Sequence, residues 1–206
     1  MSTYRLVEKR INTIIELIEG LDSFRAGTPR KSLSKLEELY NSLKLRKNPY
    51  KWKILARDLK DIIDIPKHHP SYRKLVNIHR IASILSYTSM GALIPGLYFV
   101  LKKEVVPFFY TFATIFTMTN ISFVLRIYEA RILSRIYEEK GDVLEEKGEK
   151  LKETINYLLI MLRRELRKIH RHEKGVKLNL YRVDYDNIQV VKEPSFIRST
   201  YLVRVR

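Results

Sequence analysis

The sequence predicts a mainly α-helical membrane protein. The predicted fold is a two-helix transmembrane hairpin with N-terminal amphipathic helices, a long cytoplasmic helix or coiled coil, and a small C-terminal β-sheet. Three observations carry this prediction: two long uncharged apolar stretches in close succession, heptad-like apolar spacing after them, and runs rich in β-branched residues near the C-terminus.

The two apolar stretches cover residues 81–101 and 105–125 and contain no charged side chain. At a rise of about 1.5 Å per residue, each helix spans about 30 Å, which is the thickness of the hydrocarbon core of a bilayer. The alternative is a pair of core helices in a soluble protein, but such helices seldom lack charge on every face. Because residues 102–104 permit only a tight turn, the stretches are expected to form an antiparallel hairpin.

The charges that flank the hairpin predict its orientation. Basic residues are more numerous at the two outer ends than in the turn between the stretches, which favours cytoplasmic termini by the positive-inside rule. We therefore expect a protein of the cell membrane with two spans and both termini in the cytoplasm. The outer basic residues are Lys67, Arg73, Lys74, Arg80, Arg126, Arg131 and Arg135, and those of the turn are Lys102 and Lys103.

The composition agrees with this class. The formal net charge is +16, which favours contact with anionic lipid headgroups or nucleic acid, although the positive-inside rule alone also explains basic cytoplasmic regions. The absence of cysteine excludes disulfide bonds and zinc–thiolate sites. Abundant Lys, Glu and Ile with a single Gln resemble the usage of thermophiles, so we expect a thermophilic archaeal source.

The chain is expected to divide into four regions. Residues 1–70 form a cytoplasmic or membrane-surface helical region, and residues 71–128 form the transmembrane hairpin. Residues 129–174 form a cytoplasmic helical stalk, and residues 175–206 form a small β-rich region.

Two amphipathic helices are expected before residue 47. The first covers residues 3–20 and ends at Gly20. The second begins either at a capping box that starts with Ser34 or at the Thr28-Pro29 pair, and it runs to about Arg46.

A third helix is expected to begin at Asn48-Pro49 and to end before Pro66. Basic residues surround an aromatic near its start, a pattern that suits anionic lipid headgroups or nucleic acid. The same residues also suit a solvated face of a small helical bundle, and these three interpretations stay open. The residues concerned are Lys44, Arg46, Lys47, Lys51, Trp52 and Lys53.

The stalk region predicts a short coiled-coil-like seam, because its apolar residues recur at spacings of three and four. The segment forms either one long helix or two helices folded at Gly141 or Gly148. The seam residues are Leu144, Leu151, Ile155, Leu158, Leu162 and Ile169.

A change of period at Gly175 predicts strands. Residues 177–192 are expected to form a β-hairpin that turns at Asp186-Asn187, and residues 196–205 a third strand. We expect the last strand to lie at a sheet edge that another subunit could extend.

Within the apolar stretches, small and hydroxyl residues offer surfaces for assembly. Thr88, Ala92 and Gly96 recur every four residues and would allow close helix packing, with Asn120 as a further packing residue. Thr114, Thr117 and Asn120 could line a pore in an oligomer. The alternative is hydrogen bonding within each helix.

No catalytic, cofactor-binding or metal-ligating set is predicted, because the sequence holds no Gly-rich phosphate loop, HExxH or GxSxG motif. The histidine pairs His68/His69 and His170/His172 are spaced poorly for a shared metal. No cofactor and no small-molecule substrate is expected.

These observations favour a non-enzymatic integral membrane protein that acts as an anchor, a scaffold or a subunit of a larger membrane assembly. Membrane lipid and copies of the chain or other subunits are the expected partners. A small oligomeric channel is the first alternative, and a membrane-tethered protein that binds nucleic acid or ribosomes is the second.

Overall fold

The computed structural model describes residues 3–45, 48–169, 176–195 and 198–205. It is mainly helical with a small antiparallel sheet, as predicted. The helices are α1 (Thr3–Arg25), α2 (Leu33–Ser42), α3 (Trp52–Asp64), the 3₁₀ turn η1 (Ile65–His68), α4 (Tyr72–Gly91), α5 (Leu93–Leu101), α6 (Val105–Glu139) and α7 (Gly141–Lys168). The strands are β1 (Lys177–Leu180), β2 (Ile188–Lys192) and β3 (Tyr201–Val205).

The chain folds into two compact units. The helix–sheet unit consists of Met1–Ile65 together with Lys140–Arg206, and the hairpin unit is Pro66–Glu139. The helix–sheet unit is therefore assembled from the two segments that flank the hairpin in sequence.

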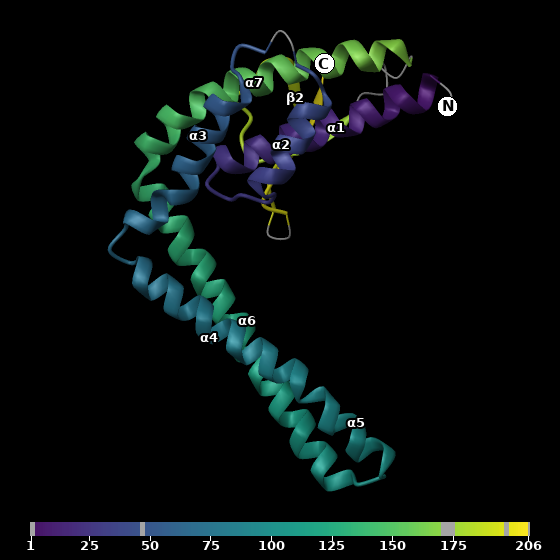
Figure 1. The fold of residues 1–206 in the computed structure, drawn as a ribbon, viewed down its shortest axis with the longest axis vertical. Helices are drawn as coiled ribbons and strands as arrows, with labels where there is room; N and C mark the ends of the chain where they lie inside the picture. The colour runs from purple at the N-terminus through teal and green to yellow at the C-terminus, as the bar shows by residue number, and fades with distance from the viewer. Residues whose placement is uncertain (1–2, 46–47, 170–175, 196–197, 206) are drawn as a thin grey trace. The chain divides into compact units, whose positions relative to one another are not determined.

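The core of the helix–sheet unit lies between α1 and α7, which pack side by side (Figure 1). The two helices are antiparallel, because Arg10 near the start of α1 pairs with Glu165 near the end of α7, and Arg25 at the end of α1 contacts Gly148. The predicted seam of α7 is buried in this unit, so its periodicity is explained by packing within one chain. Its fully or nearly fully buried members are Leu144, Leu151, Ile155, Leu158 and Leu162.

Helices α2 and α3 complete the core: α2 packs on α1 and α3, and α3 packs on α7. Leu36 of α2 and Leu55, Leu59 and Ile62 of α3 are inaccessible to solvent. Burial of such side chains stabilises the fold by about 1.5–3 kcal/mol each. The apolar faces predicted for these helices are thus covered by neighbouring helices.

The expected end of the first helix at Gly20 is wrong. The helix continues to Arg25, and a Cβ atom at Gly20 would overlap the Leu36 side chain, so this glycine permits close packing of α2 on α1. The chain turns instead at Gly27, whose φ is 67°. Neither expected start of α2 is observed, because Ser32 is the N-cap and accepts a hydrogen bond from Lys35 N.

The expected start of the third helix at Asn48-Pro49 is also wrong, because α3 begins at Trp52 with Lys51 as its N-cap. The Asn48 amide instead donates to the Tyr40 hydroxyl at 3.0 Å and to the Tyr50 carbonyl at 2.5 Å. These bonds hold Asn48 against Tyr40 and Tyr50, and its amide oxygen makes no capping hydrogen bond to α3.

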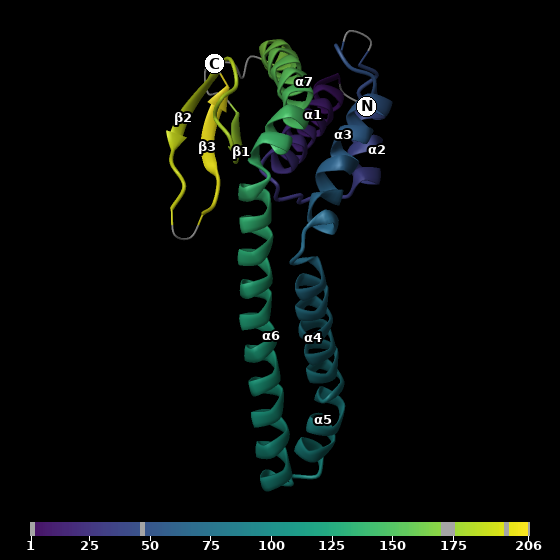
Figure 2. The same cartoon turned by 90° about the vertical axis from the view of Figure 1, so that its left-hand side faces the viewer.

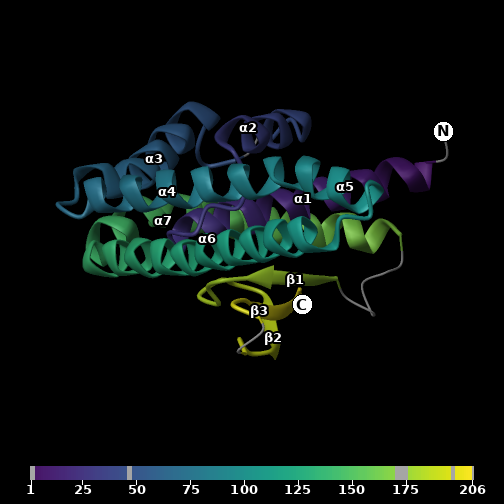
Figure 3. The ribbon, with the colours of Figure 1, turned by 90° about the horizontal axis from the view of Figure 1, so that it is seen from below.

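The sheet has the order β1–β3–β2, and both pairings are antiparallel (Figures 2 and 3). The predicted hairpin of residues 177–192 is wrong, because β1 and β2 do not pair. The predicted edge position of the last strand is wrong as well, since β3 lies in the centre and pairs through Val203 with Leu178 and Val190. β1 contacts α1, whereas the side chains of β2 are mostly exposed.

In the hairpin unit, α4 and α5 run antiparallel to α6, as predicted. The first span is interrupted at Ala92, since Pro95 has no N–H to donate to the Gly91 carbonyl. The turn closes with Glu104 N bonded to Phe99 O and Lys103 N to Val100 O, the pattern of a Schellman motif, with Lys103 at φ 58°.

The region after the second span contains two helices, since α6 ends at Glu139 and α7 begins at Gly141. Of the arrangements left open by the sequence, the break at Gly141 is the observed one. α6 therefore belongs entirely to the hairpin unit and α7 to the helix–sheet unit.

Candidate functional site

The most unusual surface of the described chain is the outside of the hairpin. Tyr87 and Ile94 are each 75% exposed and Leu101 is 83% exposed, although their side chains are large and apolar. Helices in the core of a soluble protein bury such residues. The segments Tyr72–Leu101 and Val105–Glu139 are long and apolar enough to cross a membrane.

Small residues occupy the seam inside the hairpin. Ala82, Ser89, Gly96 and Ser122 are buried there, and the Ser122 hydroxyl donates across the seam to the Ala82 carbonyl at 2.8 Å. Small side chains allow two helix backbones to approach closely, and hydrogen bonds between helices hold them together in lipid.

The residues predicted to pack the hairpin occupy different environments. Gly96 is buried, and a Cβ added to it would lie 3.5 Å from the Thr111 methyl group. Ala92 is half-buried and Thr88 is exposed. Gly96 therefore faces α6, whereas Thr88, which lies earlier in the chain, points away from it.

The residues predicted to line a pore, Thr114, Thr117 and Asn120, are all exposed on α6. The Thr114 hydroxyl donates to the Tyr110 carbonyl at 2.9 Å, and the Asn120 amide donates to the Phe116 carbonyl at 2.7 Å. Such bonds satisfy the donors within the same helix. These two side chains therefore have hydrogen-bond partners without a neighbouring subunit.

A basic pocket lies at the open end of the hairpin, between the start of α4 and the last turns of α6. We call it the base pocket; its volume is about 370 Å³. Lys74 approaches from α4, where its ammonium group lies 2.9 Å from the Tyr128 hydroxyl. The lining residues are His69, Ser71, Lys74, Tyr128, Arg131, Ile132, Arg135, Ile136 and Glu139.

Sequence reasoning used Lys74, Arg131 and Arg135 only as orientation signals and did not place them in one site. The spacing of four residues between the two arginines puts them on one helix face. Nothing in the sequence pattern gave the register of α4 against α6, which brings Lys74 to the same place.

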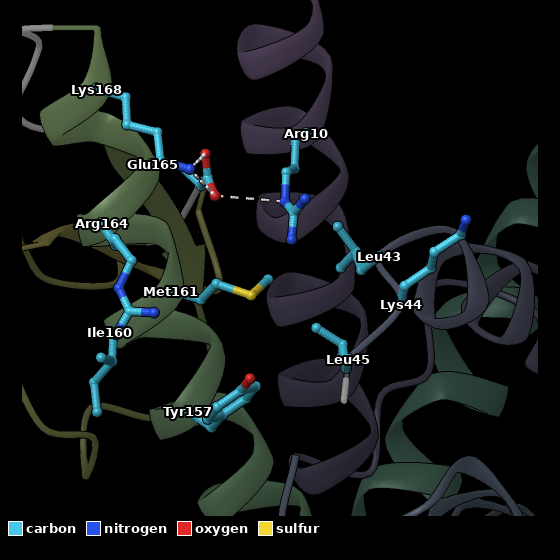
Figure 4. Close-up of a pocket in the computed structure, with 10 residues that line it drawn as sticks. All are labelled: Arg10, Leu43, Lys44, Leu45, Tyr157, Ile160, Met161, Arg164, Glu165 and Lys168. Atoms are coloured by element: carbon cyan, nitrogen blue, oxygen red, sulfur yellow. Dashed lines mark hydrogen bonds and ion pairs between the residues drawn. The ribbon is translucent and has the colours of Figure 1, made fainter. Parts of the chain in front are cut away.

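A second pocket, of about 310 Å³, lies in the helix–sheet unit between α1, the end of α2 and α7 (Figure 4). Its buried carboxylate, Glu165, pairs with Arg10 at 3.5 Å and with Lys168 at 2.9 Å. Lys44 and Arg164 add further positive charge, and Met161 is among the apolar residues that line the same pocket. The paired carboxylate offsets part of the positive charge.

Of the basic residues predicted around Trp52, Lys44, Lys51 and Lys53 are described, and all three are exposed. Trp52 is half-buried and packs on Tyr40 with ring centroids 5.3 Å apart, while Lys51 and Lys53 are exposed. The indole thus contributes to the α2–α3 core. Arg46 and Lys47 lie outside the described residues, as do His170, His172 and Gly175.

A buried polar network joins the end of α1 to the segment after β1. Asp22 is inaccessible to solvent and accepts hydrogen bonds from the Tyr185 hydroxyl at 2.6 Å, from Arg182 N at 3.3 Å and from Tyr181 N. Burial raises the pKa of Asp22 above its ordinary value, while these donors oppose the rise. Burial also raises the pKa of Tyr185, which therefore keeps its proton.

The second half of this network is a buried arginine. Arg25 is 2% exposed and donates to both carboxylate oxygens of Asp184, at 3.0 and 2.9 Å. These bonds, together with the bond from Lys152, hold the pKa of Asp184 well below its usual range. Bidentate pairing of this kind fixes geometry, so the network fastens the segment between β1 and β2 to α1.

Comparison of the chain with protein-family models, with curated proteins and with solved structures found no match. Within the described ranges, no group of three or more metal-ligating side chains comes together.

Proposed function

We propose that the chain is an integral membrane protein without catalytic activity, which anchors the helix–sheet unit at the cytoplasmic face of the cell membrane as part of a larger assembly. The observation that carries this proposal is the exposed apolar surface of the hairpin. So many exposed large apolar side chains on both helices would be strongly unfavourable in water and are favourable in lipid.

The character of the spans supports an anchor more than a pump. Residues 81–101 and 105–125 contain no ionisable side chain. Proton relays and charged-substrate sites within membranes use such groups. Tight packing through Ser122 and Gly96 further suits a hairpin that stays closed.

The helix–sheet unit offers a surface for partner docking. In the described chain, β2 pairs with β3 on one side, and its other edge has no paired strand. Val190 and Val191 are exposed on this strand, at 41% and 39%. An extended segment of a partner could add to this edge through main-chain hydrogen bonds.

Membrane insertion and orientation can be tested together, because the chain has no cysteine of its own. Lys103→Cys in the turn should react with a membrane-impermeant maleimide on intact cells. Lys53→Cys in α3 should react only after the cells are permeabilised. Both variants should stay in the membrane pellet during alkaline carbonate extraction.

Two outcomes would contradict this part of the proposal. Release of the protein by carbonate would show that the hairpin does not cross the bilayer. Equal labelling of both cysteines on intact cells would show that the orientation is wrong. Lys103 and Lys53 are exposed lysines, which makes the two substitutions comparable.

The assembly itself is tested by native mass measurement after extraction in mild detergent. We expect a homo-oligomer or a stoichiometric complex with another chain. A clean monomer under these conditions would count strongly against a role as a scaffold or subunit.

A small oligomeric channel is the second candidate, favoured by the exposure of Thr114, Thr117 and Asn120 on one helix. If these residues face a pore, replacement of all three by Leu should abolish ion flux through protein reconstituted in liposomes. Flux that is absent, or that is unchanged in the triple variant, rejects the channel.

A further inference from the structure

We propose that the base pocket binds the phosphate group of an anionic lipid headgroup. This inference rests on the proposed membrane insertion of the hairpin. It assigns a ligand to a site that sequence reasoning did not find.

The charges of the base pocket call for an anion. Within the described residues, no carboxylate is paired with Lys74, Arg131 or Arg135, although all three line the same cavity. Arg131 and Arg135 are four residues apart on α6, a spacing at which like charges repel. A phosphate bound between the two arginines would attract both and offset their mutual repulsion.

The one carboxylate of the pocket is already engaged. Glu139 Oε2 lies 3.0 Å from His69 Nε2, and the Ser71 N–H donates to His69 Nδ1 at 3.1 Å. Because Nδ1 accepts a hydrogen bond, Nε2 carries the ring proton and donates it to Glu139. Glu139 keeps its negative charge in this bond, so the pocket still holds three cations, Lys74, Arg131 and Arg135, against one carboxylate.

The depth of the pocket matches the lipid headgroups. Lys74 precedes the first apolar stretch by seven residues and Arg131 follows the second by six, which places both about 10 Å beyond the hydrocarbon boundary along a helix. The headgroup layer is about 5–8 Å thick on each side. Side chains of a helix lean towards its N-terminus, so the arginines of α6 lean back towards the membrane and reach this layer.

The chemistry of the lining groups suits a phosphate ester. Arginine presents a planar fork of donors that matches two phosphate oxygens, and the Lys74 ammonium supplies a point charge. Ile132 and Ile136 form an apolar side to the same cavity, which could contact the glycerol and the first acyl carbons. Basic pockets between helices on the cytoplasmic side are known to suit anionic headgroups.

The experiment uses the full chain, purified in a mild non-ionic detergent and titrated with dioleoyl phosphatidylglycerol or dioleoyl phosphatidylcholine under native mass spectrometry. We expect a first phosphatidylglycerol molecule to bind more tightly than phosphatidylcholine. The Arg131→Gln/Arg135→Gln variant should bind it about 25-fold more weakly, at about fivefold for each arginine near the membrane surface.

The matched control is Arg80→Gln/Arg126→Gln. This variant removes the same total charge next to the apolar stretches, one arginine from α4 and one from α6, but neither residue lines the pocket. Its affinity for phosphatidylglycerol should stay within about twofold of the wild type. Equal losses in both variants would reject the pocket in favour of diffuse positive charge.

A soluble phosphate is the other source of the same chemistry. Competition by millimolar inorganic phosphate that depends on Arg131 and Arg135 would overturn the lipid assignment. Carbonate extraction of each variant separates this inference from the proposed function: protein that stays in the membrane but shows no phosphatidylglycerol preference rejects the pocket alone, whereas protein released by carbonate rejects both.

Discussion

The two units of this chain bury opposite kinds of residue. In the helix–sheet unit, leucine and isoleucine such as Leu158 and Ile14 are fully buried, and charged residues cover the outside. In the hairpin unit, Ala82, Ser89 and Ser122 are buried, while large apolar side chains are exposed. This difference is what the proposed membrane insertion of the hairpin requires, with water around one unit and lipid around the other.

The treatment of polar groups follows the same division. The helix–sheet unit buries the charged side chain of Arg25, whose partner Asp184 is 42% exposed and stays in contact with water. The hairpin buries a neutral hydroxyl bonded to a carbonyl, at Ser122. Isolated charges in lipid are costly. A hydrogen bond between two neutral groups avoids this cost and is therefore suited to a lipid environment.

The largest expected effect comes from a matched pair of leucine substitutions. Leu158→Ala should lower the free energy of unfolding of the helix–sheet unit by about 3 kcal/mol, since it leaves a cavity in a fully buried position. Leu97→Ala, at a position 64% exposed on the hairpin, should change it by less than about 0.5 kcal/mol.

The fluorescence of Trp52 measures this effect, because it is the single tryptophan and lies in the helix–sheet unit. Chemical denaturation in detergent should separate the two variants clearly. Similar midpoints for both would show that burial does not distinguish the two units.

The next prediction places an aspartate on an exposed surface of each unit. Ile94→Asp should disfavour membrane insertion by about 3 kcal/mol if the hairpin lies in lipid. Ile160→Asp, at a position 51% exposed on α7, should leave insertion unchanged. The inserted fraction can be measured by glycosylation of sites introduced in the turn.

Normal insertion of the Ile94→Asp variant, together with improved solubility, would contradict the membrane assignment. The exposed apolar surface would then have to be covered by another protein.

The sequence predicted the hairpin well because its signal is local. Length, lack of charge and the short turn at Lys102–Glu104 together determine two antiparallel helices, and their limits follow from composition. The interruption at Ala92 was missed, although Pro95 was a visible cause of it. Local sequence features were therefore sufficient to predict two antiparallel helices. The helix break that Pro95 causes in the preceding turn was not predicted.

The sheet and the base pocket depended on contacts between distant residues, and sequence reasoning failed there. Besides the pairing of β3 with β1 and β2, Asp22 accepts a hydrogen bond from Tyr185 and Arg25 donates to Asp184, more than a hundred residues away in sequence. Likewise, Lys74 and Arg131 line the same pocket only because of the register of α4 against α6. No periodicity along the chain reports such contacts.

A third prediction concerns the pH dependence of the helix–sheet unit. The pKa of Asp184 is lowered in the folded state, chiefly by the hydrogen bond from Arg25. It therefore stabilises the fold above its unfolded-state pKa of about 3.9, and this contribution is lost as the pH falls through the lower folded-state pKa. Asp184→Asn should cost about 2 kcal/mol at pH 7, after allowance for screening at its exposed side. This cost should shrink steadily as the pH falls below about 4 and vanish only below the folded-state pKa.

The matched control is Asp61→Asn, which removes an exposed pairing with Lys147 at 3.4 Å. It should cost less than about 0.5 kcal/mol at any pH. The raised pKa of Asp22 acts in the opposite direction in every variant, so differences between denaturation curves isolate Asp184. A pH-independent cost of Asp184→Asn would mean that its charge does not contribute.

The smallest expected effect tests how the hairpin holds together. Ser122→Ala removes the hydrogen bond to the Ala82 carbonyl and should destabilise the packing of α4 on α6 by about 0.6 kcal/mol, the average for such bonds in membranes. Thr114→Val removes a hydroxyl bonded within its own helix and should have no measurable effect on packing. Steric-trapping or thermal unfolding in bicelles can resolve the two. A larger effect for Thr114→Val would indicate that this threonine meets another subunit, which would favour the pore over the solitary hairpin seam.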